Sequence, residues 1–116
     1  MRILLAEHHT KVLRALRRLI SARSEFAIAG EATDWDALVR QAKITKPDLV
    51  LLSWGLPGRA DDTPFAELRT DDCYPKIIVL STQSEVKEEA LAAGADAFVS
   101  KGDSPEKLLE ALGSSP

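Results

Sequence analysis

The sequence predicts a doubly wound α/β fold built on a five-stranded parallel sheet. Three short apolar runs have no polar alternation, which is typical of strands that are buried on both faces of a parallel sheet. Amphipathic segments separate these runs and predict helices that cover the sheet. The three runs are RILLA (2–6), DLVLL (48–52) and KIIVL (76–80).

Two weaker segments complete the expected set of five strands, FAIAGEA (26–32) and DAFVS (96–100). The first helix is expected from Thr10 to Ser21, because steps of about 100° per residue separate an apolar arc from a basic one. The basic arc contains Lys11, Arg14, Arg17 and Arg18.

Capping signals place the remaining helices. Thr33 is expected to cap a second helix, which has acids in its first turn and continues to about Ile44, before Lys46 and Pro47. Proline in a first turn and glycine after a last turn mark the others. We expect a short helix from Pro64 to Leu68, one from Ser84 to Gly94, and a last one opening at Ser104 and Pro105.

Length and composition indicate one globular domain, which we place at residues 1–113 with a tail at 114–116. The chain has 116 residues, of which 45% are hydrophobic and 28% charged. It has no apolar run near the roughly 18 residues that span a membrane. A net charge of −3 argues against direct binding of nucleic acid by this domain, and one cysteine permits no internal disulfide. We therefore expect a cytoplasmic protein.

Polar residues follow the ends of several predicted strands. In a doubly wound sheet the carboxyl ends of the strands form the functional edge, so these side chains are expected to converge there. They are Glu7, His8 and His9 after the first strand, Ser53 after the third, Ser81 and Thr82 after the fourth, and Lys101 after the fifth.

Four motifs occur in order at these strand ends: ILLAEHH, PDLVLLSWGLPG, KIIVLST and AGADAFVSK. From Arg2 to Leu112 the chain resembles the receiver domains of two-component response regulators. The resemblance implies a flavodoxin-like (βα)5 fold with strand order 2-1-3-4-5. It also implies a cytoplasmic signalling role, with a phosphorelay partner.

The chain departs from this family at two of three acidic site positions. Such receivers hold Mg²⁺ with two acids after the first strand, where this chain has Glu7 and His8. Their third strand ends in the aspartate that accepts a phosphoryl group, where this chain has Ser53. Because Mg²⁺ requires hard oxygen ligands, we expect its binding to be weak or lost, and no other cofactor is expected.

Three other positions match the family. Ser81 and Lys101 stand where receivers contact the phosphoryl group, and Phe98 stands where they carry a switch aromatic. A serine hydroxyl must lose a proton to attack a phosphoryl donor, and here no metal is expected to assist. The resulting prediction is an atypical receiver, or pseudo-receiver, that acts as an interaction module and not as an enzyme.

The partner is expected to be a protein: a histidine kinase, a phosphotransfer protein, another regulator or a second copy. The basic arc of the first helix is either a solvated face or a surface for an acidic partner. We also expect a short fourth helix, and Trp54 close enough to the site to report on it. Many receivers have a cis-proline where this chain has Gly102.

Three alternatives stay open. Phosphoryl transfer to a surrogate residue such as Asp61 or Asp62, or a small ligand in the vacated pocket, could still switch the domain. A hydrolase using Ser53, His8 and Glu7 would need an oxyanion hole, for which the sequence has no signal. A transition-metal site at Glu7, His8 and His9 is disfavoured, because the adjacent His8 and His9 side chains at a strand end are expected to point to opposite sides.

Overall fold

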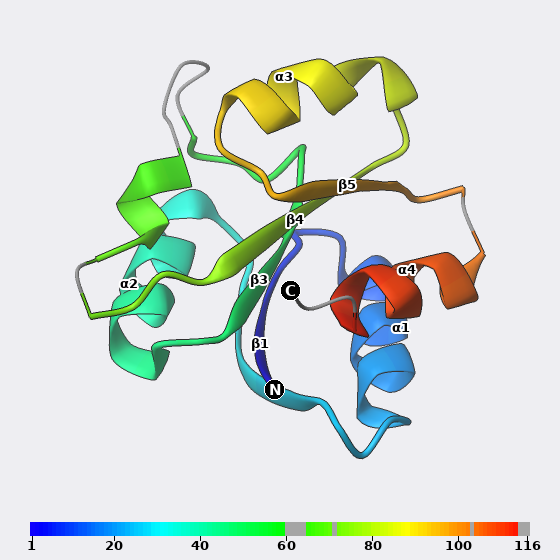
Figure 1. The fold of residues 1–116 in the computed structure, drawn as a ribbon, viewed down its shortest axis with the longest axis horizontal. Coiled ribbons are helices and arrows are strands. Elements are labelled where there is room, and N and C mark those ends of the chain that lie inside the picture. The colour runs from blue at the N-terminus through cyan, green and yellow to red at the C-terminus, as the bar shows by residue number, and fades with distance from the viewer. Residues whose placement is uncertain (60–64, 71, 103, 114–116) are drawn as a thin grey trace.

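The computed structural model describes residues 1–59, 65–70, 72–102 and 104–113. Five parallel strands form one sheet in the order β2-β1-β3-β4-β5, which confirms the predicted fold and strand order (Figure 1). The strands are β1 (Arg2–Ala6), β2 (Ala27–Ala32), β3 (Leu49–Ser53), β4 (Lys76–Ser81) and β5 (Ala97–Ser100).

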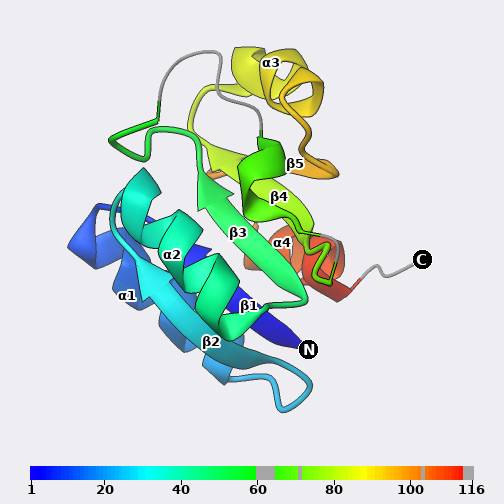
Figure 2. The ribbon, with the colours of Figure 1, turned by 90° about the vertical axis from the view of Figure 1, so that its left-hand side faces the viewer.

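Helices cover both faces of this sheet (Figures 1 and 2). On one face, α1 (Thr10–Ser21) and α4 (Pro105–Gly113) pack over Ile3, Leu5 and the other strand residues whose side chains point to that face. On the other face α2 (Trp35–Thr45) and α3 (Lys87–Ala92) pack over the alternate strand residues, with Phe65 fully buried among them. No helix among the described residues is long and apolar enough to cross a membrane.

The N-terminus of α2 differs from the prediction by one residue. Asp34, and not Thr33, is the N-cap, and its side chain accepts a hydrogen bond of 2.8 Å from the backbone N–H of Ala37. Thr and Asp are both favoured as N-cap residues, because either side chain can accept a hydrogen bond from a free backbone N–H in the first turn. The sequence motif alone therefore did not distinguish Thr33 from Asp34 as the cap. The helix ends at Thr45, and Lys46 adopts the left-handed conformation with φ 46°.

The connections around β4 contain less α-helix than predicted. Before β4, the expected helix from Pro64 to Leu68 is a 3₁₀ turn, η1 (Phe65–Leu68), and Pro64 lies outside the described residues. After β4, the expected helix from Ser84 to Gly94 is a 3₁₀ turn, η2 (Ser84–Val86), followed by the six-residue α3. The helix between β4 and β5, the fourth of the expected set, is therefore short, as predicted.

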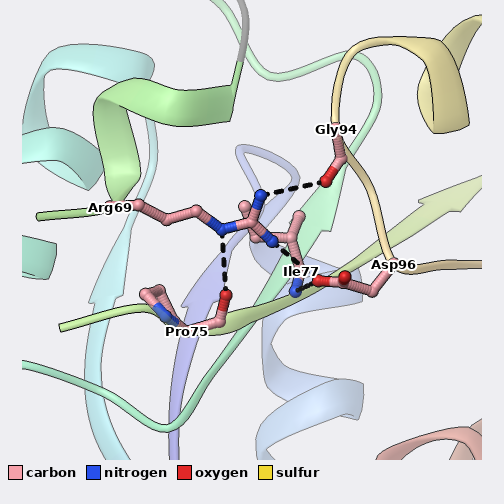
Figure 3. Close-up of polar contacts among 5 residues, drawn as sticks. All are labelled: Arg69, Pro75, Ile77, Gly94 and Asp96. Atoms are coloured by element: carbon pink, nitrogen blue, oxygen red, sulfur yellow. Dashed lines mark hydrogen bonds and ion pairs between the residues drawn. The ribbon is translucent and has the colours of Figure 1, made fainter.

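Arg69 joins three segments at the amino-terminal edge of the sheet (Figure 3). Its guanidinium donates to the carbonyls of Pro75 and Gly94 at 3.3 and 3.2 Å and to Asp96 Oδ2 at 2.7 Å. Asp96 Oδ2 also accepts from the N–H of Ile77 at 2.8 Å. Because the Arg69 side chain is only 10% exposed, this cluster fixes η1 against the starts of β4 and β5.

We predict that Arg69→Ala lowers the free energy of unfolding by about 2 kcal/mol, because it removes a charge-assisted hydrogen bond and two others from a largely buried position. Arg23→Ala is the matched control, because it removes an arginine from an exposed ion pair. The Arg23 side chain is 50% exposed, and its Nη1 lies 3.6 Å from Glu25 Oε1. That variant should change stability by less than about 0.5 kcal/mol. Urea denaturation followed by circular dichroism measures both, and equal effects would contradict a clamp at Arg69.

Candidate functional site

The polar residues predicted at the carboxyl edge do lie together there. Ser53 and Ser81 are the last residues of β3 and β4, Glu7 follows β1, and Lys101 follows β5. Because all strands are parallel, their carboxyl ends share one edge. The backbone N–H of Lys101 donates to the carbonyl of Ser81 at 2.8 Å, which fixes the start of the Lys101 loop against β4.

Lys101 is the centre of the site. Its Nζ lies 2.9 Å from Glu7 Oε1 and 2.8 Å from Ser53 Oγ. The Glu7 side chain is 1% exposed and that of Lys101 is 20% exposed, so the ion pair is largely removed from water. Burying a carboxylate is costly unless a cation and hydrogen bonds compensate, and Lys101 supplies both.

A hollow of about 340 Å³, the site hollow, opens above this ion pair. Ser53 and Ser81 are both buried, and Ser81 Oγ accepts a hydrogen bond of 3.0 Å from the N–H of Gln83. The residues that line the hollow include His8, Ser53, Trp54, Ser81, Thr82 and Lys101. Trp54 therefore lies at the site, where its fluorescence can report on the occupancy of the hollow.

The two histidines lie side by side, contrary to the expectation that they point to opposite sides. Their ring centroids are 4.0 Å apart at an interplanar angle of 43°, and both residues are exposed at the mouth of the site hollow. The expectation was wrong because both residues lie beyond β1, where the alternation of a strand no longer holds; His9 is the N-cap of α1. Among the described residues, no group of three or more His, Cys, Asp or Glu side chains could hold a metal ion.

Phe98 lies in β5, partly buried, and packs against the core beneath α2 and α3. Its role as a switch stays a prediction. Asp61 and Asp62, the considered surrogate acceptors, lie outside the described residues.

Sequence reasoning missed an arginine surrounded by aromatic rings next to the site. The guanidinium carbon of Arg59 lies 4.9 Å from the ring centroid of Phe65, 5.3 Å from that of Trp54 and 6.0 Å from that of Trp35. Cations are attracted to aromatic ring faces at such distances. The rings come from three different segments, so no local pattern indicated the cluster.

The basic arc of α1 is exposed, but its four residues are not equivalent. Arg17 makes two contacts of 2.6 Å with Glu31 on β2, and its hydrogen bond is the main cause that lowers the pKa of Glu31. Among the described residues, Lys11, Arg14 and Arg18 make no ion pair. The surface that remains for a partner is therefore Lys11, Arg14 and Arg18.

An apolar groove of about 470 Å³ lies between α1 and α4, and we call it the α1–α4 groove. Val12 and Leu19, at the borders of the apolar arc of α1, are only partly buried and line it. The position of Val12 and Leu19 at the border of the apolar arc was the one sequence signal for this groove. That signal did not indicate that α4 would leave these two side chains partly uncovered. Lys11 and Lys101 also line the groove.

Comparison with known proteins identifies the family. The model of the response regulator receiver domain matches residues 3–113. The chain belongs to the response regulator receiver family. Receiver domains act in two-component signalling, where they interact with histidine kinases and other proteins, and they are generally signalling domains rather than enzymes.

Two curated relatives and one solved structure illustrate the likeness. This receiver is 31% identical over 112 residues to the nitrate/nitrite response regulator protein NarL of Escherichia coli K12, covering 95% of the chain and 52% of NarL. The chain thus spans about half the length of that relative. Over 102 residues it is 32% identical to the chemotaxis protein CheY of Thermotoga maritima, covering 86% of the chain and 85% of CheY.

The solved structure is a LuxR-family two-component response regulator from Aurantimonas sp. SI85-9A1. It superposes with a TM-score of 0.85 at 31% identity and covers 96% of this chain and 81% of that one. The receiver scaffold is therefore retained over nearly all of the chain.

We predict that Lys101→Met lowers the free energy of unfolding by about 3 kcal/mol, because Glu7 is left buried without its cation. Adding Glu7→Gln should recover at least half of the loss, since a neutral amide costs less to bury. Urea denaturation of wild type, both single variants and the double variant measures the coupling. Additive effects of the two substitutions would show that the residues do not stabilise each other.

Proposed function

We propose that this receiver domain is an atypical receiver, a signalling interaction module that is not phosphorylated on an aspartate at the end of β3. The observation that carries the proposal is Ser53. It ends β3, is buried, and accepts a hydrogen bond from Lys101 at the position where the family's acceptor aspartate is expected. A hydroxyl is not an ionised nucleophile, and transfer to it would need a base and a metal.

The surroundings of Ser53 support the loss of metal-assisted transfer. Of the three acidic positions implied by the family, only Glu7 is a carboxylate, and it is ion-paired with Lys101. With His8 neutral, the formal charge of Glu7 and Lys101 together is about zero, so there is little attraction for a divalent cation. Mg²⁺ also prefers an octahedral set of oxygen ligands, which one buried carboxylate and a serine do not provide.

Two alternative functions, a hydrolase and a receiver switched by phosphoryl transfer, have less support than an interaction module. A hydrolase would need a base for Ser53, but the described hydrogen bond to Ser53 Oγ comes from Lys101, which also donates to Glu7. A phosphoryl switch would need a surrogate acceptor, and among the described residues no carboxylate lines the site hollow. For the partner we infer a histidine kinase, a phosphotransfer protein, another regulator or a second copy, with Lys11, Arg14 and Arg18 meeting acidic groups.

Mg²⁺ and phosphodonors test the proposal directly. We expect no saturable change in Trp54 fluorescence on adding Mg²⁺ up to millimolar concentration, or on adding beryllium fluoride afterwards. Incubation with acetyl phosphate should leave the intact mass unchanged. Saturable quenching together with the mass gain of one phosphoryl group would refute the proposal.

Restoring the two missing carboxylates should restore the metal site. We predict that His8→Asp combined with Ser53→Asp binds Mg²⁺ at least tenfold more tightly than wild type, because two new carboxylates then line the site hollow next to the buried Glu7. Ser53→Asp alone should gain little, because one metal-ligand position remains a histidine. The double variant is also the positive control for the fluorescence assay, and its failure to respond would mean that the backbone geometry has changed too.

A further inference from the structure

The site hollow presents hydrogen-bond donors that have no acceptor. Ser53 Oγ accepts from Lys101 Nζ, and Ser81 Oγ accepts from the N–H of Gln83, so each hydroxyl still has its proton to donate. An ammonium has three N–H donors, and Lys101 uses two of them on Glu7 and Ser53. In the described part of the chain, three donors from β3, β4 and the β5 end thus remain available at one hollow.

No carboxylate lines this hollow among the described residues. Glu7 touches Lys101 but is 1% exposed and does not form part of the lining. Two exposed imidazoles, His8 and His9, stand at the mouth. Free donors and a lysine, without an exposed acid, favour an oxyanion over a cation.

The α1–α4 groove adjoins the site hollow. Val12, Leu80 and Lys101 line both, so the polar and apolar spaces meet at the lysine. The groove adds Ala15, Leu16, Leu19, Val99, Pro105 and Leu108, and among the described residues it has no acidic lining side chain. Lys11 adds a second positive charge to its wall.

We infer that the two spaces together bind one small amphipathic anion, a phosphate or carboxylate head joined to an apolar body. The head accepts hydrogen bonds from Ser53, Ser81 and Lys101, and the body lies along Leu16, Leu19 and Leu108 in the α1–α4 groove. The inference rests on the proposed function, because an aspartate with bound Mg²⁺ at the Ser53 position would reverse the polarity of the hollow. Binding is non-covalent and needs no metal.

Three probes separate the contributions of head and body: inorganic phosphate, hexyl phosphate and 1-hexanol. Each is titrated into the wild-type chain with EDTA present, by calorimetry and Trp54 fluorescence. We expect saturable one-to-one binding of hexyl phosphate, at least tenfold weaker binding of inorganic phosphate, and none of 1-hexanol. The expected difference in affinity between hexyl phosphate and inorganic phosphate comes from burial of the hexyl methylenes. Each fully buried methylene raises the affinity about fourfold.

Two variants locate the ligand. Ser53→Asp places a carboxylate in the site hollow and should weaken hexyl phosphate and inorganic phosphate alike, by at least tenfold. Ala15→Glu places a carboxylate in the α1–α4 groove, at an exposed position of α1. It should weaken the binding of hexyl phosphate by at least tenfold and have little effect on the binding of inorganic phosphate. Ala92→Glu is the matched control: it makes the same charge change at an exposed helical position on α3 and should leave both affinities unchanged.

The outcomes are decisive in both directions. Equal affinity for inorganic and hexyl phosphate would overturn the role of the groove, and binding of 1-hexanol as tight as hexyl phosphate would overturn the role of the donors. Sedimentation showing a dimer that Ala15→Glu disrupts, without ligand binding, would assign the groove to a second copy instead. Failure of the proposed function is seen separately, as a phosphoryl mass gain with acetyl phosphate and Mg²⁺, neither of which is present in these titrations.

Discussion

The carboxyl edge of the sheet depends on the ammonium group of Lys101. One side chain connects the residue after β1, the last residue of β3 and the loop after β5, through contacts of 2.9 Å to Glu7 and 2.8 Å to Ser53. A buried carboxylate is strongly destabilising without a partner, so Glu7 and Lys101 require each other.

We propose that Ser53, at the end of β3 where the family's acceptor aspartate is expected, alters the chemistry of the site on a receiver scaffold. Strand order, helix layers and strand ends are those of a receiver, and residues 3–113 match the family. In the same proposal, one carboxylate beside Lys101 leaves the site hollow with donors for an anion in place of acceptors for a cation. At the opposite edge Arg69, Asp96 and the carbonyl of Gly94 hold the strand starts independently of the site.

Prediction from sequence succeeded where the signal was local burial and failed where several local choices were close in energy. The bounds of α1 and β1 were predicted without error, because their apolar spacing is regular. The cap at Asp34 rather than Thr33, and the 3₁₀ turn at Phe65–Leu68 rather than a helix, are choices between neighbours of similar propensity. The histidine pair was mispredicted because the alternation of a strand was applied to His8 and His9, which lie beyond the end of β1.

The order of apolar runs and amphipathic segments indicated the α/β class, the strand ends and the residues at those ends. This was possible because the pattern of burial along a strand or helix is visible in neighbouring residues of the sequence. The meeting of Lys101 with Glu7, 94 positions apart, was expected only as proximity at an edge. Packing between distant segments decided which donors remain unused, that two histidine rings lie together and that the α1–α4 groove and the site hollow share a wall. Such contacts depend on side-chain conformation in the folded chain, which no local pattern encodes.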